Sequence, residues 1–176
     1  DAGEVVRLEL PEFAVRDLES PDVERPAQFD LALGLVRAAA RLAAGELGPL
    51  ANAAVSVRWW RPQTYYDEPG RGTLARDGGG VLLTQAIHTL DLFLSLTPPL
   101  AEVAAFAGTS ALHVMETEDC VAAALRFDGG ALGALDATTA AFPGFAERID
   151  LAGTRATAVL TPGKLELYHH DGRRES

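Results

Sequence analysis

The chain has 176 residues, 48% of them hydrophobic and 23% charged, a composition typical of one globular domain and not of a disordered segment. Its formal net charge of −10 argues against a nucleic-acid partner, because a phosphate backbone would repel it. No apolar run approaches the roughly 20 residues that cross a bilayer, so we expect no membrane partner.

Cys120 is the only cysteine, which excludes an intrachain disulfide and a cysteine metal cluster. We therefore expect a reducing, cytoplasmic location. The first residues, Asp1 to Glu4, lack a methionine and the features of a signal peptide. This start predicts that the chain begins inside a longer gene product or after a removed segment.

Residues 1–27 are predicted to form an arm or linker. They contain an acidic stretch that Pro11, Pro21 and Pro26 interrupt, and these prolines break any helix. The domain itself is predicted to span residues 28–176.

Two helices and one strand are predicted before the β-rich part of the chain. Apolar residues recur at helical spacing from 28 to about 46, and residues 54–61 alternate as in a strand. Residues 62–80 form a long irregular loop, a kind of segment that is usually functional or disordered, and its aromatic residues favour a function. A second, strongly apolar helix then runs from 81 to about 96, where two prolines stop it.

The rest of the chain is predicted to be β-structure. Turn residues separate six short strands, and the connections Asp128-Gly129-Gly130 and Thr161-Pro162-Gly163 are short enough to require antiparallel neighbours. Because the strands come in a run, the predicted class is α+β: a predominantly antiparallel sheet of about six to eight strands with two main helices on one face. The six strands are expected at residues 101–108, 120–127, 131–139, 148–152, 157–160 and 165–168.

Polar side chains mark one face of the second helix. Thr84 and His88 are four residues apart and Asp91 is three beyond His88, so all three are expected on one face. Gly78–Gly80 allow another backbone or a ligand to approach the helix start, where free N–H groups suit an oxygen-rich ligand. A histidine so placed is suited to exchange a proton with a hydroxyl or carbonyl group near neutral pH. The alternative is a core histidine bonded to Asp91 or to backbone.

The long loop offers further candidates for ligand contacts. Arg61 and Arg71 flank two tyrosines, and guanidinium groups suit sugar hydroxyls or a carboxylate; solvated arginines are the alternative. Tyr65 and Tyr66 are suited to donate hydrogen bonds to a substrate or, alternatively, to anchor the loop. His113 and its acidic neighbours lack a close second histidine, so we predict no metal site.

Four groups of residues follow one another in an order typical of one protein family. They are Gln28-Phe29-Asp30 with Gly45-Glu46-Leu47-Gly48; Trp59-Trp60-Arg61-Pro62-Gln63 with Tyr65-Tyr66 and Arg71-Gly72-Thr73; Gly78-Gly79-Gly80 with Gln85-Ala86-Ile87-His88 and Asp91; and Glu118-Asp119 with Phe127, Gly129-Gly130 and Gly133. In this order they resemble the first helix, a substrate loop, the glycine-rich helix and the following hairpin of the C-terminal domain of Gfo/Idh/MocA oxidoreductases. The resemblance covers roughly residues 28–168.

The resemblance implies a fold like the C-terminal domain of glyceraldehyde-3-phosphate dehydrogenase. In the family, an N-terminal Rossmann domain binds NAD or NADP, and a histidine on the glycine-rich helix serves the transfer of hydride and proton on a sugar. We therefore predict the substrate-binding half of an oxidoreductase that transfers a hydride between NAD(P) and a sugar or cyclic polyol. His88 is the predicted catalytic residue, and the predicted substrate-binding residues are Arg61, Tyr65, Arg71, Thr84 and Asp91.

Two departures from the family pattern concern catalysis. No Gly-x-Gly-x-x-Gly follows a strand, and Lys164 is the only lysine, so the Rossmann domain and the family's Glu-Lys-Pro site are absent from this chain. We expect no cofactor-binding residues here and no activity of the chain alone. Thr84 stands where many members carry an aspartate. The alternative function is a stand-alone, non-catalytic domain for dimerisation or ligand binding.

The family resemblance also implies a homo-oligomer. In the family, the open face of the sheet commonly packs against a second subunit, which buries surface that a monomer exposes. Small residues such as Ala134, Ala137 and Thr139 suit a flat contact between two sheets, so we predict a homodimer.

Overall fold

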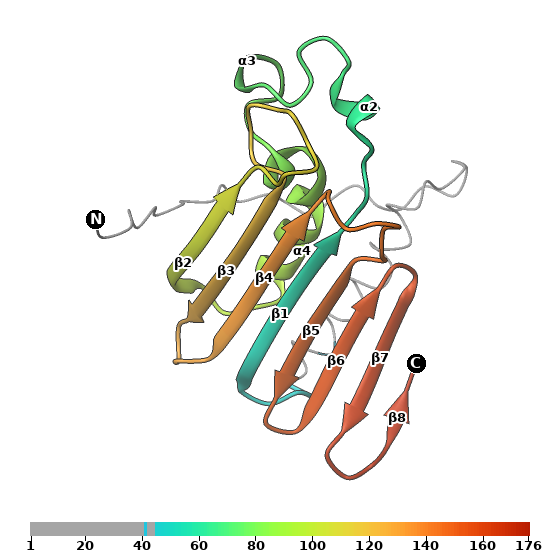
Figure 1. The fold of residues 1–176 in the computed structure, drawn as a ribbon. Helices are drawn as coiled ribbons and strands as arrows, with labels where there is room; N and C mark the ends of the chain where they lie inside the picture. Colours follow the sequence, from blue (N-terminus) through green and yellow to red (C-terminus); the bar gives the residue numbers. More distant parts are fainter. Residues whose placement is uncertain (1–40, 42–44) are drawn as a thin grey trace, which may run out of the picture.

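The computed structural model describes Arg41 and residues 45–176. The predicted arm over residues 1–27 and nearly all of the predicted first helix lie outside the described residues. The described part forms one broad sheet, with one helix behind it and two short helices beyond the ends of its strands (Figure 1).

Eight strands form the sheet, in the spatial order β2-β3-β4-β1-β5-β6-β7-β8. All neighbouring pairs are antiparallel except β1 and β4, which are parallel. The α+β class and the predominantly antiparallel sheet predicted from the sequence are confirmed. The strands are β1 (Leu50–Arg58), β2 (Leu100–Gly108), β3 (Cys120–Phe127), β4 (Leu132–Thr138), β5 (Arg148–Gly153), β6 (Ala156–Thr161), β7 (Lys164–His169) and β8 (Arg174–Glu175).

The described helices all lie between β1 and β2 in the chain. Two are short, α2 (Gln63–Tyr66) and α3 (Leu74–Asp77). The predicted second helix is present, but it is divided into a π-helical segment, η1 (Leu82–Ala86), and an α-helix, α4 (Ile87–Ser95). None of the helices in the described part is long and apolar enough to cross a membrane.

The parallel pair of β1 and β4 determines where the candidate site lies. Parallel neighbours need a long crossover connection, and here it contains all the described helices and then β2 and β3. In Figure 1, α2 and α3 lie beyond the C-terminal end of β1, and α4 lies behind the half of the sheet that contains β2, β3 and β4. The predicted substrate loop and the glycine-rich helix are therefore parts of one crossover.

One face of the sheet is packed. Ala53, Val55 and Val57 of β1 are buried, and the residues between them are less so, as the alternation of a strand requires. α4 contributes Phe93, whose ring centroid lies 6.0 Å from that of Phe127 in an edge-to-face arrangement. Full burial of an apolar side chain of this size contributes about 1.5–3 kcal/mol, so these contacts fix α4 on the sheet.

The opposite face is open and made of small residues. The register places Ala104, Ala124, Ala134 and Ala54 side by side across β2, β3, β4 and β1. Phe106, also on β2, is 88% exposed. The expectation that Ala137 and Thr139 also lie on this face is wrong, because both are buried: Ala137 packs with Val57 and Val81, and Thr139 bonds to Tyr66.

Candidate functional site

A cavity of about 150 Å³ lies between the loop after β1 and the start of the η1–α4 helix. It contains three of the predicted substrate-binding residues, Tyr65, Arg71 and Thr84. The other lining residues are Tyr66, Gly72, Arg76, Asp77, Gly79, Gly80, Gln85, Met115 and Thr117. The structure thus brings together residues that the sequence places as far as 52 positions apart, Tyr65 and Thr117.

Glu118 closes the glycine-rich start of the helix. Its carboxylate accepts a hydrogen bond from the Gly80 N–H, at 3.1 Å from each oxygen, and its carbonyl accepts one from the Val81 N–H at 2.9 Å. A Cβ atom on Gly80 would lie only 1.9 Å from the Glu118 carbonyl oxygen. The sequence allowed either a ligand or another backbone segment to lie against these glycines, and in the structure the backbone of Glu118 lies against Gly80.

Two guanidinium groups lie against the Tyr65 ring. The Arg71 guanidinium carbon is 4.0 Å from the ring centroid and that of Arg61 is 5.3 Å away. Arg71 also pairs with Glu68 at 2.5 Å, so its charge is partly compensated. Within the described part, the Nε atoms of Arg61 and Arg71 are buried without a hydrogen-bond partner. The predicted residues Arg61, Tyr65 and Arg71 are therefore in contact with one another, but Arg61 does not line the cavity.

The two neighbouring tyrosines have different environments. Tyr66 is buried, and its hydroxyl group lies 2.6 Å from the Thr139 hydroxyl. Burial raises the pKa of Tyr66, because a phenolate would be desolvated there. Tyr65 is only half-buried and lines the cavity. Of the two roles considered for these residues, the loop anchor fits Tyr66, whereas Tyr65 lies at the cavity.

Gln85 is a lining residue that sequence reasoning missed. It is 7% exposed, and its Nε2 donates to the Tyr65 hydroxyl oxygen at 3.3 Å. The single hydrogen of the Thr84 hydroxyl is shared between two acceptors, the Gln85 Oε1 and the Gly80 carbonyl oxygen, the latter 2.8 Å away. Gln85 stands within the motif used for the family resemblance, but an amide side chain carries no reactive group that would single it out.

His88 and Asp91 lie on the helix but do not line the cavity. Both are exposed on α4, so His88 is not the core histidine of the alternative interpretation. Thr84 belongs to the π-helical segment, whereas His88 and Asp91 belong to α4. The one-face prediction assumed α-helical spacing throughout, and a π-helical turn changes that spacing.

A buried hydrogen-bonded pair, His113 and Asp119, supports the segment that begins at Arg61. His113 and Asp119 have fully buried side chains, with Nδ1 2.5 Å from the carboxylate, and His113 Nε2 lies 2.8 Å from the Arg61 carbonyl oxygen. Ser110 donates to Asp119 from both its N–H and its hydroxyl group, each at 2.6 Å. Burial alone would raise the pKa of Asp119, but the Ser110 donors and His113 outweigh it and lower that pKa.

Hydrogen bonds occupy three of the four side chains considered as metal ligands from the sequence, those of His113, Glu118 and Asp119; the fourth is that of Glu116. Asp119 bonds to His113 and Ser110, and Glu118 binds the Gly80 N–H. No group of three or more metal-ligating side chains is found in the described ranges.

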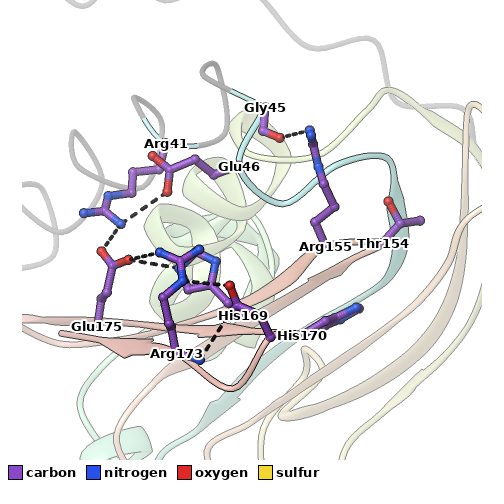
Figure 2. A pocket seen from close by; sticks show the side chains of 10 residues that line it. Arg41, Gly45, Glu46, Thr154, Arg155, His169, His170, Arg173 and Glu175 are labelled. Carbon is purple, nitrogen blue, oxygen red and sulfur yellow. Dashed lines mark hydrogen bonds and ion pairs between the residues drawn. The ribbon is translucent and has the colours of Figure 1, made fainter.

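A second, wider hollow of about 700 Å³ lies at the other end of the sheet (Figure 2). Its charged side chains bond to one another: Glu175 pairs with Arg41 at 2.5 Å and with His169 at 3.0 Å, while Arg173 pairs with Asp171 at 2.8 Å. The hollow therefore contains a self-compensated network that links the turn after β7 and strand β8 to Arg41.

The glycine run at the start of the η1–α4 helix is occupied by a neighbouring residue. The run Gly78–Gly80 precedes a helix, but Glu118 accepts the N–H groups of Gly80 and Val81 and fills the space beside Gly80. A pyrophosphate needs free N–H groups at such a position. The Gly80 position is therefore closed to a pyrophosphate group.

Comparison with known proteins places the chain in a family. The model of the GFO/IDH/MocA C-terminal domain matches residues 35–159. A comparison with curated proteins finds no relative of this chain.

Three solved structures illustrate the similarity. The WlbA dehydrogenase from Bordetella pertussis, in complex with NADH and UDP-GlcNAcA, is 32% identical over 74% of this chain, with a TM-score of 0.69. The WlbA dehydrogenase from Chromobacterium violaceum, with the same ligands, is 29% identical over 77% of it, with a TM-score of 0.70. A levoglucosan dehydrogenase in complex with NADH shares the fold, with a TM-score of 0.73 over 84% of the chain at 19% identity, and the match covers 44% of that protein.

The matched part of this chain corresponds to only 40% and 39% of the two WlbA dehydrogenases. The match is nevertheless specific, because the family model covers most of the sheet, the predicted substrate loop and the glycine-rich helix. The chain belongs to the GFO/IDH/MocA family, whose C-terminal domain it contains.

Proposed function

We propose that this chain forms the substrate-binding half of an oxidoreductase that transfers a hydride between NAD(P) and a sugar or cyclic polyol. The observation that carries the proposal is the convergence of Tyr65, Arg71 and Thr84 on one cavity, within a domain of this family. The sugar class is supported by the WlbA relatives, which were crystallised with NADH and UDP-GlcNAcA.

Arg61, Tyr65 and Arg71 supply the binding surface in this proposal. Guanidinium groups donate several hydrogen bonds in a fixed planar arrangement, which suits the vicinal hydroxyls of a sugar or a carboxylate on it. The Tyr65 ring, held against both guanidinium groups, gives the sugar an apolar edge and a hydroxyl group. Thr84 contributes a neutral hydroxyl group at the helix side of the cavity.

His88 is the proposed acid/base. It is exposed on α4, one helical turn beyond the segment that lines the cavity, and is therefore accessible to a ligand. Imidazole exchanges protons readily near neutral pH, which suits the proton that accompanies hydride transfer at a carbinol carbon. Asp91 lies three residues further along the same helix and is also exposed, where it offers an acceptor to a sugar hydroxyl.

The cofactor would supply the hydride chemistry, and NAD or NADP would be held by a part of the protein outside this chain. Both WlbA relatives contain NADH, which supports NAD as the first cofactor to test. The chain's own residues bind and orient the sugar and handle the proton.

The same proposal includes a homo-oligomer in the cytoplasm. The open face presents a row of alanines from four adjacent strands and the exposed Phe106, a flat apolar surface of the kind that a second subunit covers. Its expected partner is a second copy of this chain.

The native gene product that contains this chain provides the test of the proposed function. It should reduce NAD or NADP in the presence of a sugar substrate, with UDP-GlcNAcA and levoglucosan as the first compounds to try. His88→Ala should lower turnover by about 10²-fold, because proton transfer by a positioned side chain contributes that much. His170→Ala, at an exposed position on the turn after β7, is the matched control. Absence of nucleotide reduction with every sugar would favour a non-catalytic ligand-binding or dimerisation domain.

A further inference from the structure

The hydroxyl groups of Tyr65 and Tyr66 have partners of different kinds. The Tyr66 hydroxyl is buried and paired with the Thr139 hydroxyl at 2.6 Å, so its hydrogen-bonding capacity is used inside the protein. The Tyr65 hydroxyl oxygen accepts a hydrogen bond from Gln85 Nε2 at 3.3 Å. Among the residues that the structure describes, nothing accepts the hydrogen of the Tyr65 hydroxyl group.

The orientation of the Gln85 amide determines the direction of this hydrogen bond. Gln85 is nearly fully buried, so water does not satisfy its amide group. Its Oε1 faces the Thr84 hydroxyl, whose single hydrogen it shares with the Gly80 carbonyl oxygen, and its Nε2, which can only donate, faces Tyr65. Because a phenol has one hydrogen and accepts through its oxygen lone pairs, a Tyr65 that accepts from Gln85 keeps its own hydrogen for another acceptor.

The charges around Tyr65 favour an electron-rich acceptor. The Arg71 guanidinium lies 4.0 Å from the ring centroid and that of Arg61 lies 5.3 Å away, so two positive groups flank the ring. Glu68 is a counter-ion of Arg71. Positive charge against the ring favours the approach of an oxygen that carries negative charge, such as that of a carboxylate or a polarised carbonyl.

We propose that Gln85 is a positioning residue: it directs the Tyr65 hydroxyl hydrogen into the cavity, so the cavity selects a substrate with a carbonyl or carboxylate oxygen at that point. The identity of the ligand as a sugar derivative rests on the proposed function above. The direction of the hydrogen bond between Gln85 and Tyr65 does not, because it is a property of the free protein.

The free protein provides the first arm of the test. The side-chain amide protons of Gln85, observed by NMR in the 15N-labelled full-length protein, should move upfield and exchange faster in Tyr65→Phe, because the acceptor of Nε2 is lost. Tyr168→Phe is the matched control, since Tyr168 also lies against a guanidinium group, that of Arg174 at 5.0 Å, but on the open face of the sheet. Unchanged Gln85 amide signals in Tyr65→Phe would overturn the proposal, because Tyr65 would then donate to Gln85.

The second arm measures what the orientation does for the ligand. Gln85→Glu keeps the size of the side chain, but its carboxylate accepts the Tyr65 hydrogen and turns it away from the cavity. The KM for UDP-GlcNAcA should rise about tenfold, the cost of one such hydrogen bond, and Tyr65→Phe should add nothing further in the Gln85→Glu background. If the increases in KM from Gln85→Glu and Tyr65→Phe instead multiply in the double variant, the two residues act independently and the positioning role is overturned.

The two arms separate the failure of this proposal from the failure of the proposed function. A wild-type protein that binds and turns over no sugar derivative contradicts the proposed function, and the Gln85 amide signals still decide the hydrogen-bond direction. A sugar substrate that loses no affinity in Gln85→Glu contradicts the selection of an acceptor oxygen, even where turnover confirms the oxidoreductase.

Discussion

Tyr66 is buried and stabilises the fold through its hydroxyl group, whereas its neighbour Tyr65 is only half-buried. The Tyr66 hydroxyl and the fully buried Thr139 hydroxyl satisfy each other across the crossover and the end of β4. Tyr66→Phe should lower the free energy of unfolding by about 1–3 kcal/mol, because Thr139 loses its partner away from water. Urea denaturation measures this, and Tyr168→Phe, with an exposed ring, should stay close to the wild type. A stable Tyr66→Phe would mean that water replaces the lost hydroxyl group.

Glu166 should make the folding stability of the domain depend on pH in the acidic range. Hydrogen bonds from Arg174 and Lys164 lower its pKa to about 2, from 4.5 for a free glutamate. Because the folded-state pKa is the lower one, the contribution to stability is present above about pH 4.5 and is lost as the pH falls towards about 2. Melting temperatures of the wild type and Glu166→Gln should therefore differ at neutral pH and converge through that window. A constant difference across the window would contradict the assignment, and high salt should reduce the effect because the partners are exposed.

At the scale of single residues, the sequence predicted those site members whose chemistry is recognisable. Arg61, Tyr65, Arg71 and Thr84 were predicted from residue type and motif, and the structure gathers the last three around a cavity. Gln85 was missed because a neutral amide between two better candidates gives no signal of its own. Its role follows only from its burial and from the orientation of its two polar atoms.

The loop between β2 and β3 acts as a brace for the crossover. His113 bonds to the Arg61 carbonyl, Val114 exchanges two backbone hydrogen bonds with the Gln63 side chain, and the N–H groups of Glu116 and Thr117 both donate to the Gly72 carbonyl. The loop therefore holds the segment of Arg61 to Arg71 at both ends.

Asp119 is the anchor of this brace, and its replacement should be costly. Asp119→Asn leaves the buried His113 ring and the Ser110 donors with a mismatched partner. We expect a loss of about 3 kcal/mol in the free energy of unfolding, as when one member of a buried pair is removed. Hydrogen exchange at residues 61–72 should become faster, because the loop no longer holds them.

Asp171→Asn is the control for this prediction, since Asp171 is exposed and pairs with Arg173 at the far end of the sheet. It should leave the melting temperature and the exchange at residues 61–72 unchanged. An Asp119→Asn variant with the stability of the wild type would show that His113 holds the loop without its carboxylate partner.

At the scale of elements, local turn chemistry predicted the antiparallel hairpins but not the centre of the sheet. Asp128-Gly129-Gly130 joins β3 and β4 as predicted, with Gly129 and Gly130 at φ values of +88° and +89° that favour glycine. The parallel pairing of β1 with β4 was not predicted, because its first partners, Asn52 and Leu132, are 80 positions apart in the chain. A long crossover separates the two strands, and only packing brings them together. β8 was missed because two residues are too short for an alternating pattern.

At the scale of the whole molecule, the two faces of the sheet differ in what covers them. α4 and its apolar side chains pack against one face, whereas alanines from four adjacent strands form a flat strip on the other. Ion pairs such as Arg58–Asp136 and Arg126–Glu102 lie on the same face as this strip. A surface with an apolar centre and charged residues nearby resembles a subunit interface in its composition.

Phe106 provides the test of that interface. It is 88% exposed in the single chain and lies opposite Ala122 on the open face. In a dimer that buries this face, Phe106→Asp introduces a charge that must lose its hydration, at a cost of several kcal/mol, so the dimer should dissociate. Multi-angle light scattering after size-exclusion chromatography should show a dimer for the wild type and a monomer for Phe106→Asp. Val114→Asp, at a position that is 85% exposed but lies on the brace loop, should remain dimeric; a monomeric wild type, or a dimer that survives Phe106→Asp, would contradict the use of this face.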